Sequence, residues 1–224
     1  MRKQLIEYLK EFISDARWAR INEVLEGRTE HLTVVLEDLY QPHNASAVLR
    51  SCDGFGIQDV HVIENKNQFD ASSQITIGAD QWLTIHRYNQ EKHDNVSECF
   101  SRLRKQGFQI VATTPHENDH NLNELDITKP TALVFGTELE GVTDQVLEQS
   151  DAFVKIPMAG FSESFNISVS AAICLYDTST RLRQSDLNWN LPPERREELL
   201  LEWVKKSIKA GDQLAEKWLS ENTS

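Results

Sequence analysis

Between residues 31 and 180, short apolar segments with strand character alternate with segments that have a helical pattern of apolar residues. The strand candidates, mostly rich in β-branched or aromatic residues, are 32–36, 60–63, 82–85, 108–112, 132–135 and 153–156. The clearest helices fall at 44–54, 91–106, 143–149 and 165–182. This alternation predicts an α/β fold, in which helices cover both faces of a mostly parallel sheet.

The two ends of the chain have a purely helical pattern. In residues 2–26 the apolar residues recur every three or four positions, and Gly27 is a plausible helix C-cap. Residues 191–194 look like a linker into a second helical stripe, which is interrupted near Gly211. We therefore predict helical extensions over 1–30 and 183–224, on either side of a central domain over 31–182.

The formal net charge is −12, from 23 basic and 35 acidic residues, which taken alone argues against a nucleic-acid partner. Residues 1–30 hold six residues of each sign and residues 181–224 hold eight of each. The remaining 23 − 14 = 9 basic and 35 − 14 = 21 acidic residues lie in 31–180. The whole net charge thus belongs to the centre, and the acidic total does not exclude RNA.

The terminal helices admit two compatible interpretations, because only one face of each helix must be buried. In one, they are amphipathic caps that pack on the centre. In the other, they supply a basic surface for RNA through Arg17, Arg20, Arg28, Arg181, Arg183, Arg195 and Arg196. We expect RNA capture to depend on these helices.

Several classes of protein are excluded by what the sequence lacks. It has no run of 18 apolar residues and no apolar signal core, which argues against a membrane span and favours the cytoplasm. The cysteines Cys52, Cys99 and Cys174 are far apart, and His116 and His120 have no helical pattern around them, so we predict no disulfide framework and no metal site. Neither G-x-G-x-x-G nor a P-loop follows the first strand, so a Rossmann dinucleotide site is not expected.

The first polar cluster, residues 42–52, directly follows the first strand, where parallel sheets bind ligands. Its Asn44 and Arg50 are six residues apart, which is about 600° of helical rotation at ~100° per residue. They would therefore point in different directions, unless Asn44 is a helix N-cap. Asn44 is either a simple N-cap, with Arg50 a surface residue, or both residues belong to a binding site.

Two further clusters follow later strands. In residues 132–142 an apolar strand runs into a turn with two glycines and two carboxylates, which suits either an ordinary strand–turn–helix connection or a close approach to a ligand. In residues 154–173, Pro157 ends a strand, and Ser164 and Asn166 open a helix that is rich in small residues. That helix is a tight internal helix, a surface for another backbone, or both.

In this order the three clusters resemble the motifs of the SpoU class of SPOUT RNA methyltransferases, over essentially all of residues 31–180. The most specific part is Ile156-Pro157-Met158 with Gly160, followed by Ser164, Asn166, Ser168-Val169 and Ala171-Ala172-Ile173. The short helices at both ends are similar to those of the family branch that methylates guanosine-18 of tRNA. The ribosomal-RNA members have a larger N-terminal domain instead.

The resemblance implies a SPOUT-type parallel-sheet domain with a C-terminal deep trefoil knot, and a homodimer with the active site near the dimer interface. It implies S-adenosylmethionine as the cofactor and methyl transfer to the ribose 2′-hydroxyl of guanosine-18 in the tRNA D-loop. Two alternatives stay open. The same chemistry could act on another tRNA nucleotide or on ribosomal RNA, or the chain could be a non-catalytic RNA-binding paralogue.

The resemblance also implies roles for individual residues. Thr113, Gly136, Ile156 and Phe165 match the family's cofactor contacts, most of which use backbone groups. The positions for chemistry are Asn44, Arg50, Glu138, Ser164 and Asn166. Because a free guanidinium is a poor base, we expect Arg50 to position a phosphate and to stabilise alkoxide charge, while a phosphate-linked proton transfer through Arg50 is the alternative. Asn44 and Asn166 would hold neighbouring groups, and Glu138 would orient Asn44, Arg50 or a backbone turn.

Overall fold

The computed structural model of this chain describes residues 1–39, 41–67, 78–115, 120–138 and 140–222. Its internal contacts divide the chain into two compact units. The larger unit is Thr29–Trp189, and the smaller one combines Met1–Arg28 with Asn190–Ser224. The two ends of the chain thus fold together into one terminal unit.

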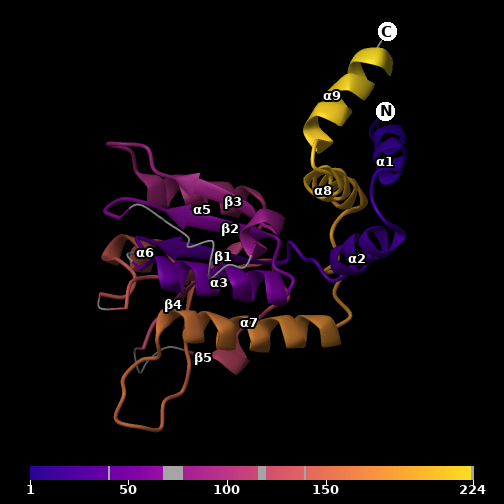
Figure 1. The fold of residues 1–224 in the computed structure, drawn as a ribbon. Coiled ribbons are helices and arrows are strands. Elements are labelled where there is room, and N and C mark those ends of the chain that lie inside the picture. The colour runs from indigo at the N-terminus through magenta and orange to yellow at the C-terminus, as the bar shows by residue number, and fades with distance from the viewer. Residues whose placement is uncertain (40, 68–77, 116–119, 139, 223–224) are drawn as a thin grey trace. The chain divides into compact units, whose positions relative to one another are not determined.

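Within the described residues, the larger unit contains a seven-stranded sheet in the order β3-β2-β1-β6-β4-β7-β5 (Figure 1). All pairs of neighbouring strands are parallel. The strands are β1 Leu32–Glu37, β2 Asp59–Ile63, β3 Thr84–Tyr88, β4 Gln109–Thr113, β5 His120–Asn121, β6 Thr131–Phe135 and β7 Ala152–Lys155. The predicted α/β fold with a mostly parallel sheet is confirmed.

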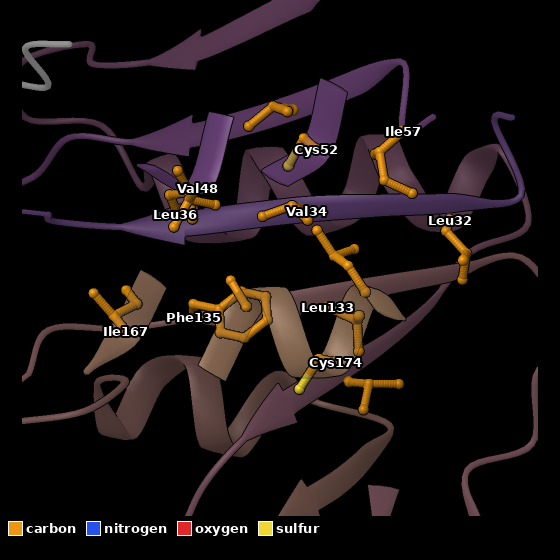
Figure 2. Close-up of a cluster of buried hydrophobic side chains, with 14 of the residues drawn as sticks. Leu32, Val34, Leu36, Val48, Cys52, Ile57, Leu133, Phe135, Ile167 and Cys174 are labelled. Carbon is orange, nitrogen blue, oxygen red and sulfur yellow. The ribbon is translucent and has the colours of Figure 1, made fainter. Parts of the chain in front are cut away.

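Helices cover both faces of this sheet. Alternate side chains of β1 and β6, among them Leu36 and Phe135, pack against α3 (Pro42–Gly54) and α7 (Ile167–Gln184), as Figure 2 shows. The other side chains of the same strands, such as Val35 and Val134, pack with α5 (Asn95–Lys105) and α6 (Asp144–Gln149). Both faces of the central strands are buried, which explains why apolar residues stand at consecutive positions in them, as at Val34, Val35 and Leu36.

Three helices of the larger unit begin at a side chain that accepts a backbone N–H. These N-caps are Asp94 for α5, Thr143 for α6 and Asn166 for α7. The cap at Asp94 explains why the helix predicted over 91–106 starts only at residue 95.

The prediction of a strand over 82–85 is wrong in its first residues. Trp82 ends a 3₁₀ turn, Ala79–Trp82, and β3 starts at Thr84 and continues to Tyr88. The two-residue strand β5 was not predicted, because a segment this short carries no alternation of apolar residues.

The terminal unit consists of four helices within the described residues. They are α1 Arg2–Lys10, α2 Asp15–Glu26, α8 Pro193–Lys206 and α9 Gly211–Asn222. Ser14 caps α2, and Gly27 is its C-cap, as predicted. Gly211 is the first residue of α9, and a Cβ atom at this position would lie 2.1 Å from the carbonyl oxygen of Lys205 in α8. Among the described residues, no helix has the length and apolar character that a membrane crossing requires.

One arginine expected on the terminal surface is in fact internal. Arg28 has no exposed area, and its guanidinium lies 5.2 Å from the centre of the Trp203 ring. Arg28 therefore adds nothing to a basic surface, and the prediction that it does so is wrong. Arg181 is also largely structural, since it donates hydrogen bonds to the carbonyls of Leu122 and Leu125.

Candidate functional site

The site is built at the edge of the sheet where all strands end. Because the strands are parallel, the residues that follow β1, β4, β6 and β7 are brought to one edge. The three polar clusters singled out in the sequence follow β1, β6 and β7 respectively, so the topology gathers them there.

Asn44, Glu138 and Asn166 form a hydrogen-bonded cluster at this edge, which we call the amide cluster. The Nδ2 atom of Asn166 donates to Oδ1 of Asn44 at 3.1 Å and also donates to a carboxylate oxygen of Glu138. Residues that are 122 and 28 positions apart in the sequence thus meet through one amide group. The structure brings together three of the five residues expected to carry the chemistry.

The orientation of each amide in the cluster is determined by its partners. Oδ1 of Asn166 accepts hydrogen bonds from the backbone N–H and the hydroxyl of Ser168, so its Nδ2 must face Asn44 and Glu138. Asn44 then presents its oxygen to Asn166 and donates from Nδ2 to Oε1 of Gln41 at 3.2 Å. The hydrogen bonds therefore follow one direction: Ser168 donates to Asn166, Asn166 donates to Asn44, and Asn44 donates to Gln41.

Asn44 is not a helix N-cap, so the simple structural interpretation of this residue is wrong. The cap position of α3 is Gln41, Pro42 opens the helix, and Asn44 lies in its first turn with 9% of its surface exposed. The Asn44 side chain is therefore free to take part in the amide cluster.

Arg50 and Ser164 are not part of the amide cluster. Arg50 is exposed on the outer face of α3 and has no hydrogen bond or ion pair with the part of the chain that the structure describes. It shares this face with Ala47, one turn away, and His43, two turns away, whereas Asn44 is turned toward the core. Ser164 is exposed in the segment that leads into α7.

Three of the residues expected to contact the cofactor, Thr113, Gly136 and Ile156, lie at the ends of β4, β6 and β7, which are adjacent in the sheet, and Phe165 directly precedes the N-cap of α7. The hydroxyl of Thr113 is already used, since it donates to the carbonyl of Val134 at 2.9 Å. Ile156 packs partly against the core, while Phe165 keeps 40% of its surface exposed. Backbone groups together with two apolar side chains suit an adenine, which has apolar faces and a hydrogen-bonding edge.

Glu138 sits on a closed loop that follows β6. The backbone groups of Thr137 and Gly141 exchange two hydrogen bonds, at 2.8 and 3.0 Å. Gly136 is required by this closure, because a Cβ atom there would lie 2.0 Å from the carbonyl oxygen of Gly141. The backbone is thus fixed at Thr137 and Gly141, the two ends of the loop that carries Glu138.

Two carboxylates at the end of β1 anchor the neighbouring loops, and the sequence analysis assigned no role to either. Glu37 is buried and accepts hydrogen bonds from the Thr143 backbone N–H at 2.9 Å and from its hydroxyl at 2.6 Å. Burial raises the pKa of Glu37, although the Thr143 hydrogen bonds oppose this change. A signal is present in the sequence: two adjacent acidic residues, Glu37 and Asp38, stand directly after the apolar run over residues 34–36.

Asp38 anchors the loop after β2. It has a positive φ of 52°, and its Oδ1 accepts the backbone N–H groups of Asn65, Lys66 and Asn67 at 2.7, 2.7 and 3.3 Å. Several N–H donors on one carboxylate form a rigid turn. The loops after β2 and β6 are thus both fixed to the end of β1.

A metal site has no candidate ligand set in the described segments: no group of three His, Cys, Asp or Glu side chains converges there. His116, considered above with His120, lies outside the described residues. Cys52, Cys99 and Cys174 are buried and do not form disulfides with one another.

A family of known proteins matches the part of the chain that contains the amide cluster. The sequence profile of the SpoU rRNA Methylase family matches residues 31–176, which is more than half of the chain and includes Asn44, Glu138 and Asn166. The chain belongs to the SpoU methylase family.

Relatives within this family extend the similarity beyond the matched domain. The chain is 41% identical to a tRNA (guanosine(18)-2′-O)-methyltransferase of Borreliella burgdorferi, over 91% of each protein. It is 35% identical to the enzyme of the same name from Thermus thermophilus, over 86% of this chain and 98% of the relative. The crystal structure of the A. aeolicus TrmH/SpoU tRNA modifying enzyme is similar with a TM-score of 0.76 and 32% identity, over 87% of this chain and 98% of that one.

Proposed function

We propose that this SpoU family member transfers a methyl group from S-adenosylmethionine to the ribose 2′-hydroxyl of guanosine-18 in the tRNA D-loop. The observation that carries the proposal is the amide cluster, in which Asn44, Glu138 and Asn166 meet at the ligand-binding edge of the sheet. The named substrate of the relatives, which match the chain almost from end to end, favours guanosine-18 over another RNA position.

The cofactor would be held at the ends of β4, β6 and β7. Thr113 and Gly136 would contribute backbone groups, and Ile156 and Phe165 would contribute apolar surface. When bound, the cofactor supplies an activated methyl group on a sulfonium that is already a good leaving group. The chain must therefore only align the ribose oxygen and help to remove its proton.

The amide cluster supplies the alignment. Asn166 is fixed by Ser168 on one side and holds both Asn44 and Glu138 on the other, so the side chains are oriented before any ligand arrives. The Glu138 carboxylate has a second oxygen for a ribose hydroxyl or for a neighbouring donor. Ser164, two residues before Asn166, would add a hydroxyl to this surface.

Arg50 would act on the RNA from outside the cluster. Its exposed position on α3 suits a phosphate of the substrate, and its guanidinium would stabilise the developing alkoxide. Transfer of the proton through an Arg50-bound phosphate is the alternative. In either case Arg50→Ala should abolish turnover while S-adenosylmethionine binding persists, as calorimetry and a methylation assay can show. Near-normal methyl transfer by Arg50→Ala would remove Arg50 from the mechanism.

The trefoil knot and the homodimer belong to the same proposal. In support of the knot, β6 lies between the earlier strands β1 and β4, and β7 lies between β4 and β5, so late strands are inserted among early ones. In support of a dimer, the helix α7 and the residues before it expose an apolar face, with Val169 43% and Tyr176 63% exposed. Sedimentation equilibrium tests the dimer. The domain boundaries at residues 30 and 182 and the cytoplasmic location stay predictions.

A labelling assay tests the function itself. Labelled S-adenosylmethionine is incubated with a tRNA transcript and with a matched transcript in which guanosine-18 is replaced. Label on the first transcript alone is the expected result. Equal labelling of both would move the target to another nucleotide, and no labelling of either would favour a non-catalytic RNA-binding protein.

A further inference from the structure

A polar pocket lies beside the loop that carries Glu138, and the function proposed above gives it no role. Its volume is about 450 Å³. Its lining comes from the ends of β1 and β2 and from the starts of α5 and α6, and consists of Asp38, Asn65, Lys66, His93, Asp94, Asn95, Thr143 and Gln145. Every lining residue carries a polar side-chain group that a hydrophilic ligand can contact.

Most acceptor atoms in this pocket are already occupied by donors from the protein. Oδ1 of Asp38 accepts three backbone N–H groups. Oδ1 of Asp94 accepts from the Ser97 backbone and from Nε2 of Gln145 at 2.7 Å. These hydrogen bonds reduce the capacity of both carboxylates to bind a cation, and they reduce the repulsion of an anion.

Donors on the β2 side of the pocket remain available. Oδ1 of Asn65 accepts from Nδ2 of Asn95 at 3.0 Å, which directs the Asn65 amide nitrogen away from that contact. The Lys66 ammonium has one ionic partner among the described residues, Glu140 at 3.6 Å, and both side chains are largely exposed. An ion pair this exposed is weak, and an incoming phosphate can replace it.

We propose that the polar pocket binds a nucleotide of the substrate RNA outside the methylated position, with Lys66 at its phosphate and the Asn65 amide at a neighbouring oxygen. The proposal rests on the proposed function, which makes RNA the substrate. A pocket with filled acceptors and spare donors fits a ligand that is rich in acceptors, and phosphate and sugar oxygens are such acceptors.

Occupation of the pocket also acts on the loop that carries Glu138. A phosphate at Lys66 separates this ammonium from Glu140, two residues after Glu138 on the same loop. Glu140 therefore competes with RNA for Lys66. Removing its charge should strengthen RNA binding, whereas removing the Lys66 charge should weaken it.

The test measures the affinity of the full chain for a tRNA transcript over a range of salt concentrations, with S-adenosylhomocysteine present. Lys66→Ala should lower the slope of log affinity against log salt by about one unit or slightly less, because one phosphate contact is lost. Between about 50 and 200 mM salt, the wild type should then lose about threefold more affinity than the variant. Lys66→Arg should retain the wild-type slope, and Glu140→Gln should bind more tightly at low salt.

Lys105→Ala is the matched control. Lys105 is an exposed lysine at the other end of α5, about 15 Å from the start of that helix. A wild-type slope for Lys66→Ala, or an equal decrease for Lys105→Ala, would overturn the proposal. Failure of the pocket and failure of the proposed function are distinguishable. If a Lys66→Ala variant binds RNA as the wild type does and still methylates guanosine-18, only the proposal for the pocket is refuted. If the salt slope depends on Lys66 but no methylation is detected, only the proposed function is refuted.

Discussion

The two units of this protein use their polar side chains in opposite ways. In the larger unit, hydrogen bonds at the carboxyl edge join residues more than a hundred positions apart, as in Asn166 with Asn44 and Thr143 with Glu37. In the terminal unit, most cations pair with an acid, either within one helical turn, as in Arg20 with Glu23 at 2.8 Å, or on another helix of the unit, as in Arg2 with Glu198 at 3.1 Å. The larger unit holds polar groups in fixed orientations at one edge of the sheet, whereas the terminal unit pairs most of its cations with its own acids.

The ends of the chain carry equal numbers of basic and acidic residues, and in the structure most of the basic ones are paired with acids. Eight arginines and lysines of the terminal unit lie in ion pairs: Arg2, Lys3, Lys10, Arg20, Arg195, Lys205, Lys206 and Lys217. Such surface pairs contribute little to stability, but they also leave little uncompensated positive potential. RNA capture by the terminal helices stays a prediction, and it depends on the few cations outside these pairs.

The largest effect is expected at the amide cluster of the larger unit. Asn166→Asp keeps the oxygen that caps α7 but removes the amide donor to Asn44 and Glu138, and places a second carboxylate against Glu138. Turnover should fall about 100-fold or more, with the thermal unfolding temperature nearly unchanged. Single-turnover methylation and thermal unfolding measure the two quantities. Wild-type turnover by Asn166→Asp would mean that the amide cluster is purely structural.

Substitutions in the terminal unit should change the free energy of unfolding rather than the rate of methyl transfer. Arg28→Ala removes a fully buried side chain that packs on Trp203, and should cost about 2–3 kcal/mol of unfolding free energy. Denaturant unfolding measures this loss. Because Arg28 is internal, tRNA affinity measured well below the unfolding transition should not change. A specific loss of RNA binding without a loss of stability would contradict the structural role.

Sensitivity to acid should belong to the larger unit, which contains all seven histidines of the chain. Burial, with a smaller effect of neighbouring His86, lowers the pKa of His61 from 6.5 to about 3. Below pH 6.5 the unfolded chain therefore takes up a proton at His61 that the folded chain refuses. The contribution of His61 is complete above pH 6.5 and is lost as the pH falls from 6.5 toward 3, by up to about 1.4 kcal/mol per pH unit. Denaturant unfolding at several pH values should show a shallower decline for His61→Gln.

The smallest effect is expected at a helix cap of the terminal unit. Ser14 accepts the Arg17 backbone N–H at 3.2 Å, and Ser14→Ala should cost about 1 kcal/mol. Ser14→Asp, which keeps an acceptor at the N-terminus of α2, is the control and should restore the stability. Equal losses for both variants in denaturant unfolding would show that Ser14 stabilises the unit in another way.

Much of the fold could be predicted because it depends on local patterns. The apolar runs of β1 and β6 are long enough to indicate buried strands, and the stripe of α7 is long enough to indicate a helix. Shorter signals fail: the sequence predicts a strand that includes Trp82, where the structure has the end of a 3₁₀ turn, and β5 has two residues and no pattern. Both errors arise because a few residues fit several conformations equally well.

The candidate site was predictable in its residues but not in its geometry. The resemblance to SpoU methyltransferases named Asn44, Glu138 and Asn166, which the structure joins by hydrogen bonds, and it also named Arg50, which lies outside that cluster. The polar pocket had no sequence signal at all, because its lining comes from four segments whose proximity depends on strand order.

The sequence by itself determined the parallel α/β class, the helical ends and the family, since these depend on apolar periodicity and on short motifs. Only the tertiary structure decided the use of each charge and amide. Arg28 is buried, and Glu37 and Asp38 accept hydrogen bonds from neighbouring loops. Asn44 is not the N-cap of α3 and accepts a hydrogen bond from Asn166. The physical reason is that a hydrogen bond or a buried charge is defined by its partner in space, and here most of those partners are distant in the chain.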